Sequence, residues 1–263
     1  MLALALDNRV ALITGGSRGI GAASVRLFRQ AGARVAFSYR SARNTAEGLA
    51  VELGGPAACV AIPQELATPE DGRALVRSTV EAFGRLDCLV VNHGVWPPED
   101  VPIAAMTDAQ WRSTLSINLD SVFGLIQAAA AQFQQQISTE GPPAAGPHIV
   151  LVSSTAGQRG EAFHADYAAS KGAIISLTKG LATELAPKGI RVNCVAPGWV
   201  DTEMSAPAMA DPTLRHRALS TIPLGRIANP VEIAGPILFL CTPLAGFMTG
   251  EIVNVNGGAV LVG

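Results

Sequence analysis

The sequence predicts one doubly wound α/β domain that covers residues 1–263, built on a parallel sheet of about seven strands with helices on both faces. Short apolar runs alternate with longer amphipathic segments along the chain, which is the order of strand–helix–strand repeats. The apolar runs are continuous, as in strands that are buried on both faces. Of the 263 residues, 49% are hydrophobic and only 15% are charged, which suits such a sheet and argues against disorder.

The expected elements follow each other in a regular order. We expect strands near 9–14, 34–39, 57–62, 87–92, 148–153, 190–196 and 252–255. We expect helices near 19–31, 43–53, 69–83, 108–136, 164–185 and 230–241. Two segments interrupt this order: a Pro/Gly-rich surface loop at 137–147, and the long segment 199–229, which follows a strand and is a candidate lid over the substrate.

The first expected strand leads into a glycine-rich turn and then into a helix. The turn reads Thr14-Gly15-Gly16-Ser17-Arg18-Gly19-Ile20-Gly21. Glycines here allow a tight turn and let the backbone approach a pyrophosphate, which can rest against the free N–H groups of the helix N-terminus. The motif therefore predicts a dinucleotide site, and a plain structural turn is the alternative interpretation.

The end of the second expected strand indicates which dinucleotide binds. A carboxylate there would bind the ribose hydroxyls and repel a 2′-phosphate, whereas a basic residue would attract the phosphate. The segment 35–43 contains no carboxylate, so Arg18 and Arg40 could hold the phosphate unless both are solvated surface arginines. We therefore expect NADP(H) as the preferred cofactor, with NAD(H) possible.

A phenol and an ammonium group lie four residues apart in the helix expected at 164–185. This spacing places Tyr167 and Lys171 on one helical face. A nearby cation favours the phenolate, so we expect Lys171 to lower the pKa of Tyr167 below its usual value of about 10. The phenol could then exchange a proton with a substrate oxygen. Ser154 lies thirteen residues before the tyrosine, at the end of a strand-like run.

Together these motifs resemble the short-chain dehydrogenase/reductase family over nearly the whole chain. The resemblance is greatest to members of the 3-oxoacyl-[acyl-carrier-protein] reductase type. It implies a Rossmann-type domain that reduces a ketone or 3-oxoacyl-type carbonyl to an alcohol with NADP(H). It also implies that Tyr167 is the proton donor, that Lys171 lowers its pKa and binds the nicotinamide ribose, and that Ser154 holds the carbonyl oxygen.

The same resemblance assigns the remaining positions. Asn118 would kink its helix and hold a water that relays protons to Lys171. The cofactor residues would be Gly15, Ser17, Arg18, Gly19, Ile20, Gly21, Tyr39, Arg40, Glu65, Leu66, Asn92, Gly94, Tyr167, Lys171, Pro197, Gly198, Val200 and Thr202. His93 departs from the family pattern, which usually has alanine there. It could narrow the nicotinamide side, take part in proton transfer, or simply pack.

The substrate side is less well defined by the sequence. We expect Ser154, His164, Tyr167 and Trp199 to contact the substrate. Further candidates for the pocket wall are Trp96, Arg159, Phe163 and Met204. The absence of lysine and arginine from 125–136 weakens the assignment of an acyl carrier protein as partner. Two alternatives remain: an NAD-dependent alcohol dehydrogenase of the same family, and a non-catalytic dinucleotide-binding sensor.

Charge and composition limit the partners. The formal net charge is −2 with no basic stripe, so we expect no nucleic-acid partner. No apolar stretch reaches the roughly 20 residues of a membrane helix, and the N-terminus lacks the features of a signal peptide, so we expect a cytoplasmic protein without a membrane partner. The four cysteines show no metal-ligand spacing, and no metal site is predicted. The resemblance implies a small-molecule carbonyl or alcohol substrate and a homotetramer or dimer that packs through 108–136, 164–185 and the C-terminal strand.

Overall fold

The structure is a computed structural model that describes residues 4–141 and 146–261 of the chain. Within these ranges one seven-stranded parallel sheet has the strand order β3-β2-β1-β4-β5-β6-β7. The strands are β1 (Val10–Ile13), β2 (Arg34–Tyr39), β3 (Cys59–Pro63), β4 (Cys88–Val91), β5 (His148–Val152), β6 (Arg191–Pro197) and β7 (Ile252–Val255). The predicted fold class is confirmed. Part of the predicted Pro/Gly-rich loop, 142–145, lies outside the described residues.

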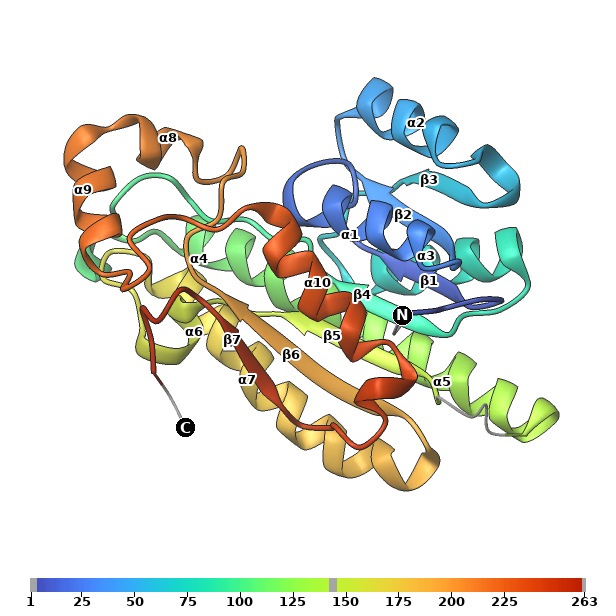
Figure 1. The fold of residues 1–263 in the computed structure, drawn as a ribbon. Coiled ribbons are helices and arrows are strands. Elements are labelled where there is room, and N and C mark those ends of the chain that lie inside the picture. Colours follow the sequence, from blue (N-terminus) through green and yellow to red (C-terminus); the bar gives the residue numbers. More distant parts are fainter. Residues whose placement is uncertain (1–3, 142–145, 262–263) are drawn as a thin grey trace.

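Helices cover both faces of this sheet (Figure 1). One face carries α1 (Gly19–Gln30), α2 (Arg43–Glu52) and α10 (Pro230–Leu240), and the other carries α3 (Pro69–Phe83), α5 (Ser121–Glu140) and α7 (Ala165–Leu185). A further helix, α4 (Asp108–Leu115), packs on α7. None of the helices in the described ranges has the length and apolar character needed to span a bilayer.

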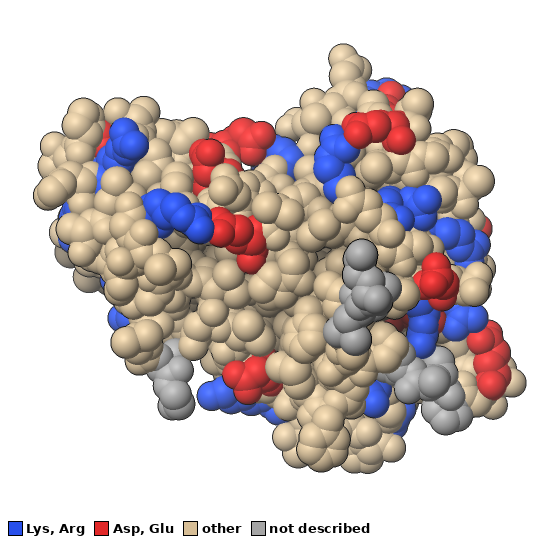
Figure 2. Space-filling view, viewed as in Figure 1, with Lys and Arg blue, Asp and Glu red and all other residues tan. Residues whose placement is uncertain are grey.

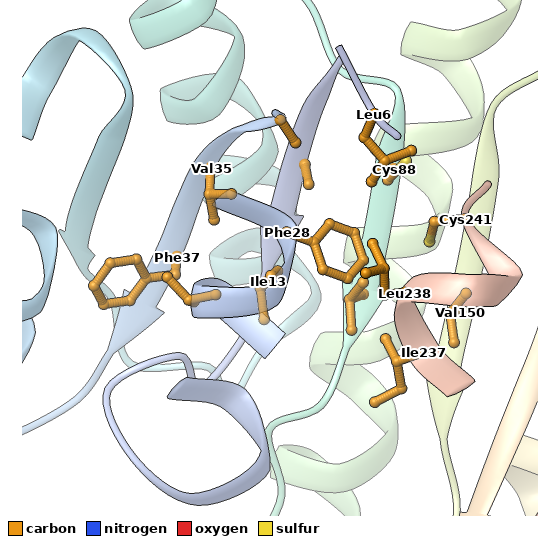
Figure 3. Packing of buried hydrophobic residues seen from close by; sticks show 14 of the residues in the cluster. Leu6, Ile13, Phe28, Val35, Phe37, Cys88, Val150, Ile237, Leu238 and Cys241 are labelled. Atoms are coloured by element: carbon orange, nitrogen blue, oxygen red, sulfur yellow. The ribbon is translucent and has the colours of Figure 1, made fainter. Parts of the chain in front are cut away.

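The core is divided into two layers by the sheet. Ala11 and Ile13 belong to the cluster on the α1 side, and Val10 and Leu12 belong to the cluster on the α3 side. Because successive side chains of a strand point to opposite faces, a continuous apolar run supplies both layers. Figure 3 shows the first layer, in which Phe28 of α1 packs among side chains from β1, β2, β4 and α10. This double burial explains why the strands could be recognised from the sequence.

The structure differs from the predicted elements in three places. A short helix that the sequence did not predict, α6 (Thr155–Arg159), follows Ser154. The helix predicted at 108–136 is interrupted: α4 ends at Leu115, a π-helical segment follows at Ser116–Asp120, and α5 continues to Glu140. The segment 199–229 contains two helices that the sequence did not predict, α8 (Ala206–Ala210) and α9 (Pro212–Ser220). Both begin with proline in their first turn and are too short to show a clear apolar period.

The strand order places the candidate residues at one edge of the sheet. The chain builds β1, β2 and β3 outward in one direction and then returns to place β4 on the other side of β1. In sheets of this kind, a crevice lies outside the carboxyl ends of the strands where the order reverses. The glycine turn follows β1, Asn92 follows β4, and Ser154 follows β5 closely, so all three meet at this edge.

Candidate active site

A cavity of about 330 Å³ opens at the carboxyl ends of the strands. In Figure 2 the surface is hollowed between the lobe formed by α8 and α9 and the half of the molecule that carries α2. The wall contains every predicted cofactor residue except Gly21, and it contains the predicted substrate contacts Ser154, Tyr167 and Trp199. The structure therefore brings together residues that are far apart in the sequence.

The glycine turn forms one end of the cavity. The backbone N–H of Gly15, whose φ is 65°, donates to the Ser38 hydroxyl at 3.0 Å, and the N–H of Gly16 donates to the Ser38 carbonyl at 2.9 Å. Helix α1 starts at the end of this turn with no side-chain cap from Arg18 and no acidic residue in its first turn. An uncapped helix N-terminus offers N–H donors and a positive dipole end to an anion. These features fit the pyrophosphate of a dinucleotide.

Gly21, which was predicted to contact the cofactor, lies outside the cavity wall. A Cβ at this position would collide with the Gly15 carbonyl oxygen and would come within 2.8 Å of the Asn92 side-chain nitrogen. Gly21 therefore allows α1 to pack closely on the glycine turn, and it lies behind the cavity wall. The prediction that it contacts the cofactor came from the motif, which does not distinguish a glycine for ligand approach from one for helix packing.

The other end of the cavity holds the three residues predicted to do the chemistry. Lys171 on α7 donates from Nζ to the Val152 carbonyl oxygen at 2.9 Å, and its Nζ lies 5.8 Å from the centre of the Tyr167 ring. The Ser154 hydroxyl accepts from the Ala156 N–H at 3.1 Å, and it acts on the Tyr167 phenol by lowering its pKa. The neighbouring Ser153 instead donates to the Lys171 carbonyl at 2.7 Å, which ties α7 to β5.

The predicted direction of the tyrosine pKa is wrong for this structure. Burial raises the pKa of Tyr167 to about 12, and the Glu161 carboxylate raises it further, while the hydrogen bond from Ser154 opposes both. Burial lowers the pKa of Lys171 to about 8. Desolvation disfavours the charged form of each group, and here it outweighs a cation that lies over the ring. Tyr167 is therefore a phenol that keeps its proton at neutral pH.

Asn118 supports the site from behind. Its side-chain oxygen accepts from the Val95 N–H at 2.8 Å, and its nitrogen donates to the Val95 carbonyl at 2.9 Å and to the Ser170 hydroxyl at 3.1 Å. The π-helical turn at Asn118 gives this side chain its reach, and the helix interruption that the family resemblance implied is present. Gly94 lies between these groups, where a Cβ would come within 3.4 Å of the Lys171 Nζ.

His93 is a packed histidine. Its Nδ1 lies 2.8 Å from the Thr14 hydroxyl, and its Nε2 lies 2.9 Å from the Ser121 hydroxyl. Because Ser121 donates its own proton to the Ile117 carbonyl, we assign the ring proton to Nε2. Burial lowers the pKa of His93 to about 3, and the Lys171 cation acts in the same direction. Of the three roles considered from the sequence, the geometry favours packing.

The substrate side of the cavity is partly as predicted. Trp96, Arg159, Trp199 and Met204 lie in its wall. His164, which was predicted to contact the substrate, does not lie in this wall. Its buried ring packs on Trp96 with ring centres 4.8 Å apart, and its Nε2 lies 3.2 Å from an Asp100 carboxylate oxygen.

Glu161 is a wall residue that the sequence analysis missed. Burial raises the pKa of its carboxyl group, whereas the His164 ring, a hydrogen bond from the Trp96 side chain and the Arg159 cation favour its charged form. A signal for it existed: the segment that joins Ser154 to Tyr167 has both ends in the site, so its residues were candidates for the cavity wall, although the sequence does not say which of them line it.

The phosphate side carries two arginines. Arg18 and Arg40 are exposed and lie in the cavity wall, and within the described ranges neither forms an ion pair. Arg43, by contrast, binds Glu47 at 2.8 Å and lies outside the wall. Arg18 and Arg40 are thus available to an anionic ligand.

Comparison with known proteins gives matches over nearly the whole chain. The model of a protein family described as enoyl-(acyl carrier protein) reductase matches residues 15–260. A 3-oxoacyl-[acyl-carrier-protein] reductase from Synechocystis is 35% identical over 261 residues, which is 98% of this chain and 99% of that protein. An L-rhamnose 1-dehydrogenase (NAD(P)(+)) from Azotobacter vinelandii is 35% identical over 259 residues, with 96% and 97% covered.

Solved structures agree with these relatives. A short-chain dehydrogenase/reductase from Brucella melitensis, titled a glucose/ribitol dehydrogenase, superposes with a TM-score of 0.88 at 35% identity and covers 99% of this chain and 100% of its own. A 3-ketoacyl-(acyl-carrier-protein) reductase from the same organism, complexed with NADH, has a TM-score of 0.86 at 29% identity, with 97% and 99% covered. A blue fluorescent protein from a metagenomic library, in complex with NADPH, has a TM-score of 0.86 at 34% identity, with 97% and 99% covered.

The pKa of His93 predicts a change in acid stability. Between about pH 6.5 and the folded value of about 3, the unfolded chain binds a proton at this position and the folded chain does not. The free energy of unfolding therefore falls as the pH falls through this window, by up to about 1.4 kcal/mol per pH unit from this group. In His93→Gln this contribution disappears, and urea unfolding at several pH values measures the slope. His216→Gln, at an exposed histidine of α9, is the matched control. An unchanged slope in His93→Gln would show that the folded protein protonates this ring.

Proposed function

This chain belongs to the short-chain dehydrogenase/reductase family, and from that premise we propose that it reduces a ketone or 3-oxoacyl-type carbonyl to an alcohol with NADPH. Family membership makes it an oxidoreductase that acts on CH–OH or C=O groups with a nicotinamide dinucleotide. The observation that supports this chemistry is geometric: Tyr167, Ser154 and Lys171 line one cavity. A phenol with a pKa of about 12 keeps its proton at neutral pH and can donate it.

In this proposal each catalytic side chain has one task. The bound nicotinamide supplies the hydride that the carbonyl carbon accepts. Tyr167 donates its phenolic proton to the carbonyl oxygen, and Ser154 holds that oxygen by its hydroxyl while negative charge develops there. Lys171, whose ammonium is fixed by the Val152 carbonyl, stabilises the phenolate that forms and binds the nicotinamide ribose. Carbon gains a hydride and oxygen gains a proton, so the product is an alcohol.

We propose NADP(H) as the preferred cofactor for an electrostatic reason. The residues after β2 contain no carboxylate at 40–42 that would repel a 2′-phosphate, and Arg18 and Arg40 face the cavity. Guanidinium groups bind phosphate by paired charge-assisted hydrogen bonds. NADH binds the related reductase from Brucella, so a preference has to be measured rather than taken from the family.

We infer a small-molecule substrate and a homotetramer or dimer. The exposed face of α5 has no basic residue with which to meet an acidic carrier protein. Large apolar side chains are exposed on the elements that the family resemblance assigned to subunit contacts, among them Phe123 on α5, which is 53% exposed, and Phe247, which precedes β7. Side chains of this kind commonly mark interfaces.

Oxidation of NADPH in the presence of a panel of ketones and β-ketoesters tests the proposed reaction. Wild-type protein should oxidise NADPH with at least one panel member, and Tyr167→Phe should lower kcat by about 100-fold or more, since general acid catalysis commonly contributes that much. Near-UV circular dichroism of the variant checks that its fold is intact. Activity that survived the loss of the phenol would remove Tyr167 from the mechanism.

The cofactor preference rests on Arg40. We expect Arg40→Ala to raise KM for NADPH by roughly 10- to 100-fold, the equivalent of losing a charge-assisted hydrogen bond of about 1.5–3 kcal/mol, and to leave KM for NADH nearly unchanged. Arg43→Ala, which removes an arginine three residues away and outside the wall, is the control. Equal effects on both cofactors would contradict a 2′-phosphate contact.

Light scattering on the purified protein tests the oligomeric state. We expect the mass of four chains or of two, and Phe123→Asp should shift the distribution towards smaller species because it places a charge in an apolar contact. A single-chain mass at micromolar concentration would contradict the inference.

A further inference from the structure

Glu161 introduces a half-buried carboxylate on the substrate side of the cavity. It lies between α6 (Thr155–Arg159) and α7, in the loop that runs from Ser154 to Tyr167. Its charge is close enough to Tyr167 to act on the pKa of the phenol. Because Glu161, Ser154 and Tyr167 line the same cavity, the carboxylate borders the space in which the substrate carbonyl would lie.

The surrounding side chains position the Glu161 carboxylate but leave some of its hydrogen-bond acceptor sites without a donor. The Trp96 side chain lies in the same wall and favours the charged form of Glu161, which lowers the pKa of its carboxyl group. Trp96 is itself fixed on both sides: its ring lies 4.8 Å from the ring of His164 and meets Trp199 edge to face at 6.1 Å. His164 in turn contacts Asp100. A carboxylate offers about four acceptor sites, and the indole can fill only one, so acceptor capacity remains on the cavity side.

This acceptor discriminates between substrates. A ligand that buries the carboxylate without offering a donor leaves it desolvated and unpaired, which costs about 1–3 kcal/mol or more for a charged group. An unsubstituted alkyl or acyl chain is such a ligand. A hydroxylated chain restores a hydrogen bond to Glu161, and the faces of Trp96 and Trp199 can pack against its C–H groups.

We propose that Glu161 determines the specificity of this cavity by accepting a hydrogen bond from a substrate hydroxyl group close to the reacting carbonyl. The substrate class is then a hydroxy ketone or hydroxy aldehyde, in place of an unsubstituted acyl chain. This inference rests on the proposed carbonyl reduction. Glu161 acts here as a specificity-determining residue, and Ser154 and Tyr167 keep the roles already assigned to them.

Matched pairs of ketones test the inference. One member carries a hydroxyl group beside the carbonyl and the other lacks it, as in 1-hydroxy-2-butanone and 2-butanone, and kcat/KM is measured for both with NADPH. Wild type should favour the hydroxylated member by roughly 10- to 100-fold, since a site built around a polar group rejects the analogue without its partner. Glu161→Leu should bring the ratio close to one, both by weakening the hydroxylated substrate, which loses its hydrogen bond, and by improving the deoxy substrate. Glu161→Gln, which keeps one acceptor oxygen, should retain part of the preference.

The matched control is Glu99→Gln, which makes the same change at an exposed carboxylate outside the cavity wall and should leave the ratio as in wild type. A wild-type ratio near one, or a ratio unchanged in Glu161→Leu with an intact fold, would overturn the assignment. If Glu161→Leu does not fold, the ratio in Glu161→Gln decides instead. A Glu161→Gln ratio as high as that of wild type would then overturn the assignment.

Binding separates this inference from the proposed reaction. Calorimetric titration of 1-hydroxy-2-butanone into wild type and into Glu161→Leu, each saturated with NADP⁺, reports affinity without turnover. Weaker binding to the variant supports the role of Glu161, whether or not any ketone of the panel is reduced. If binding is weaker and no ketone is reduced, only the proposed reaction fails. Equal binding to both proteins contradicts the inference, whatever the turnover.

Discussion

Desolvation of Tyr167 and Lys171 is the constraint on which the chemistry of this site depends. Both side chains come from α7, which the Ser153 hydroxyl ties to the end of β5, and Lys171 is fixed by the carbonyl of Val152 on the same strand. Burial moves the two pKa values in opposite directions, to about 12 for the phenol and about 8 for the ammonium. Both shifts favour the neutral form. The site therefore holds a weakly acidic phenol and an ammonium group whose charge is destabilised by burial. A phenolate nearby would stabilise the charged form of that ammonium group.

Much of the fold could be predicted from the sequence because its local signals agree with its tertiary structure. The strands are apolar on both faces since the sheet is covered on both faces, so a run such as Val10–Ile13 is visible without any long-range information. The interruption at Asn118 was not visible in the helical pattern. It depends on hydrogen bonds to Val95, which is distant in sequence, and only the family resemblance suggested it. Burial of Tyr167 is likewise a tertiary property, and for this reason the spacing to Lys171 gave the wrong direction for its pKa.

The substrate side shows where periodicity stops being informative. His164 lies three residues before Tyr167, a spacing that would place both on one helical face. Helix α7 begins only at Ala165, however, and His164 has φ −129° and ψ 48°, outside the helical region. Its ring consequently points to Trp96 and Asp100, and Glu161 reaches the cavity from the preceding loop. Residues before a helix N-terminus cannot be placed by helical spacing, and the sequence does not reveal where the first turn starts.

The charges along the cavity wall agree with the proposed direction of reaction, which is carbonyl reduction. Arg18 and Arg40 lie at the phosphate end, whereas Glu161 lies beside the phenol. A negative charge beside Tyr167 opposes loss of its proton, so less phenolate is present to act as the base in alcohol oxidation, and the phenol stays protonated as the proposed carbonyl reduction requires. In the proposed reaction, the Glu161 carboxylate repels the phenolate that forms after donation, and this repulsion favours the return of a proton. A carboxylate that selects hydroxylated substrates would thus also help to restore the acid form of the catalyst after each turnover.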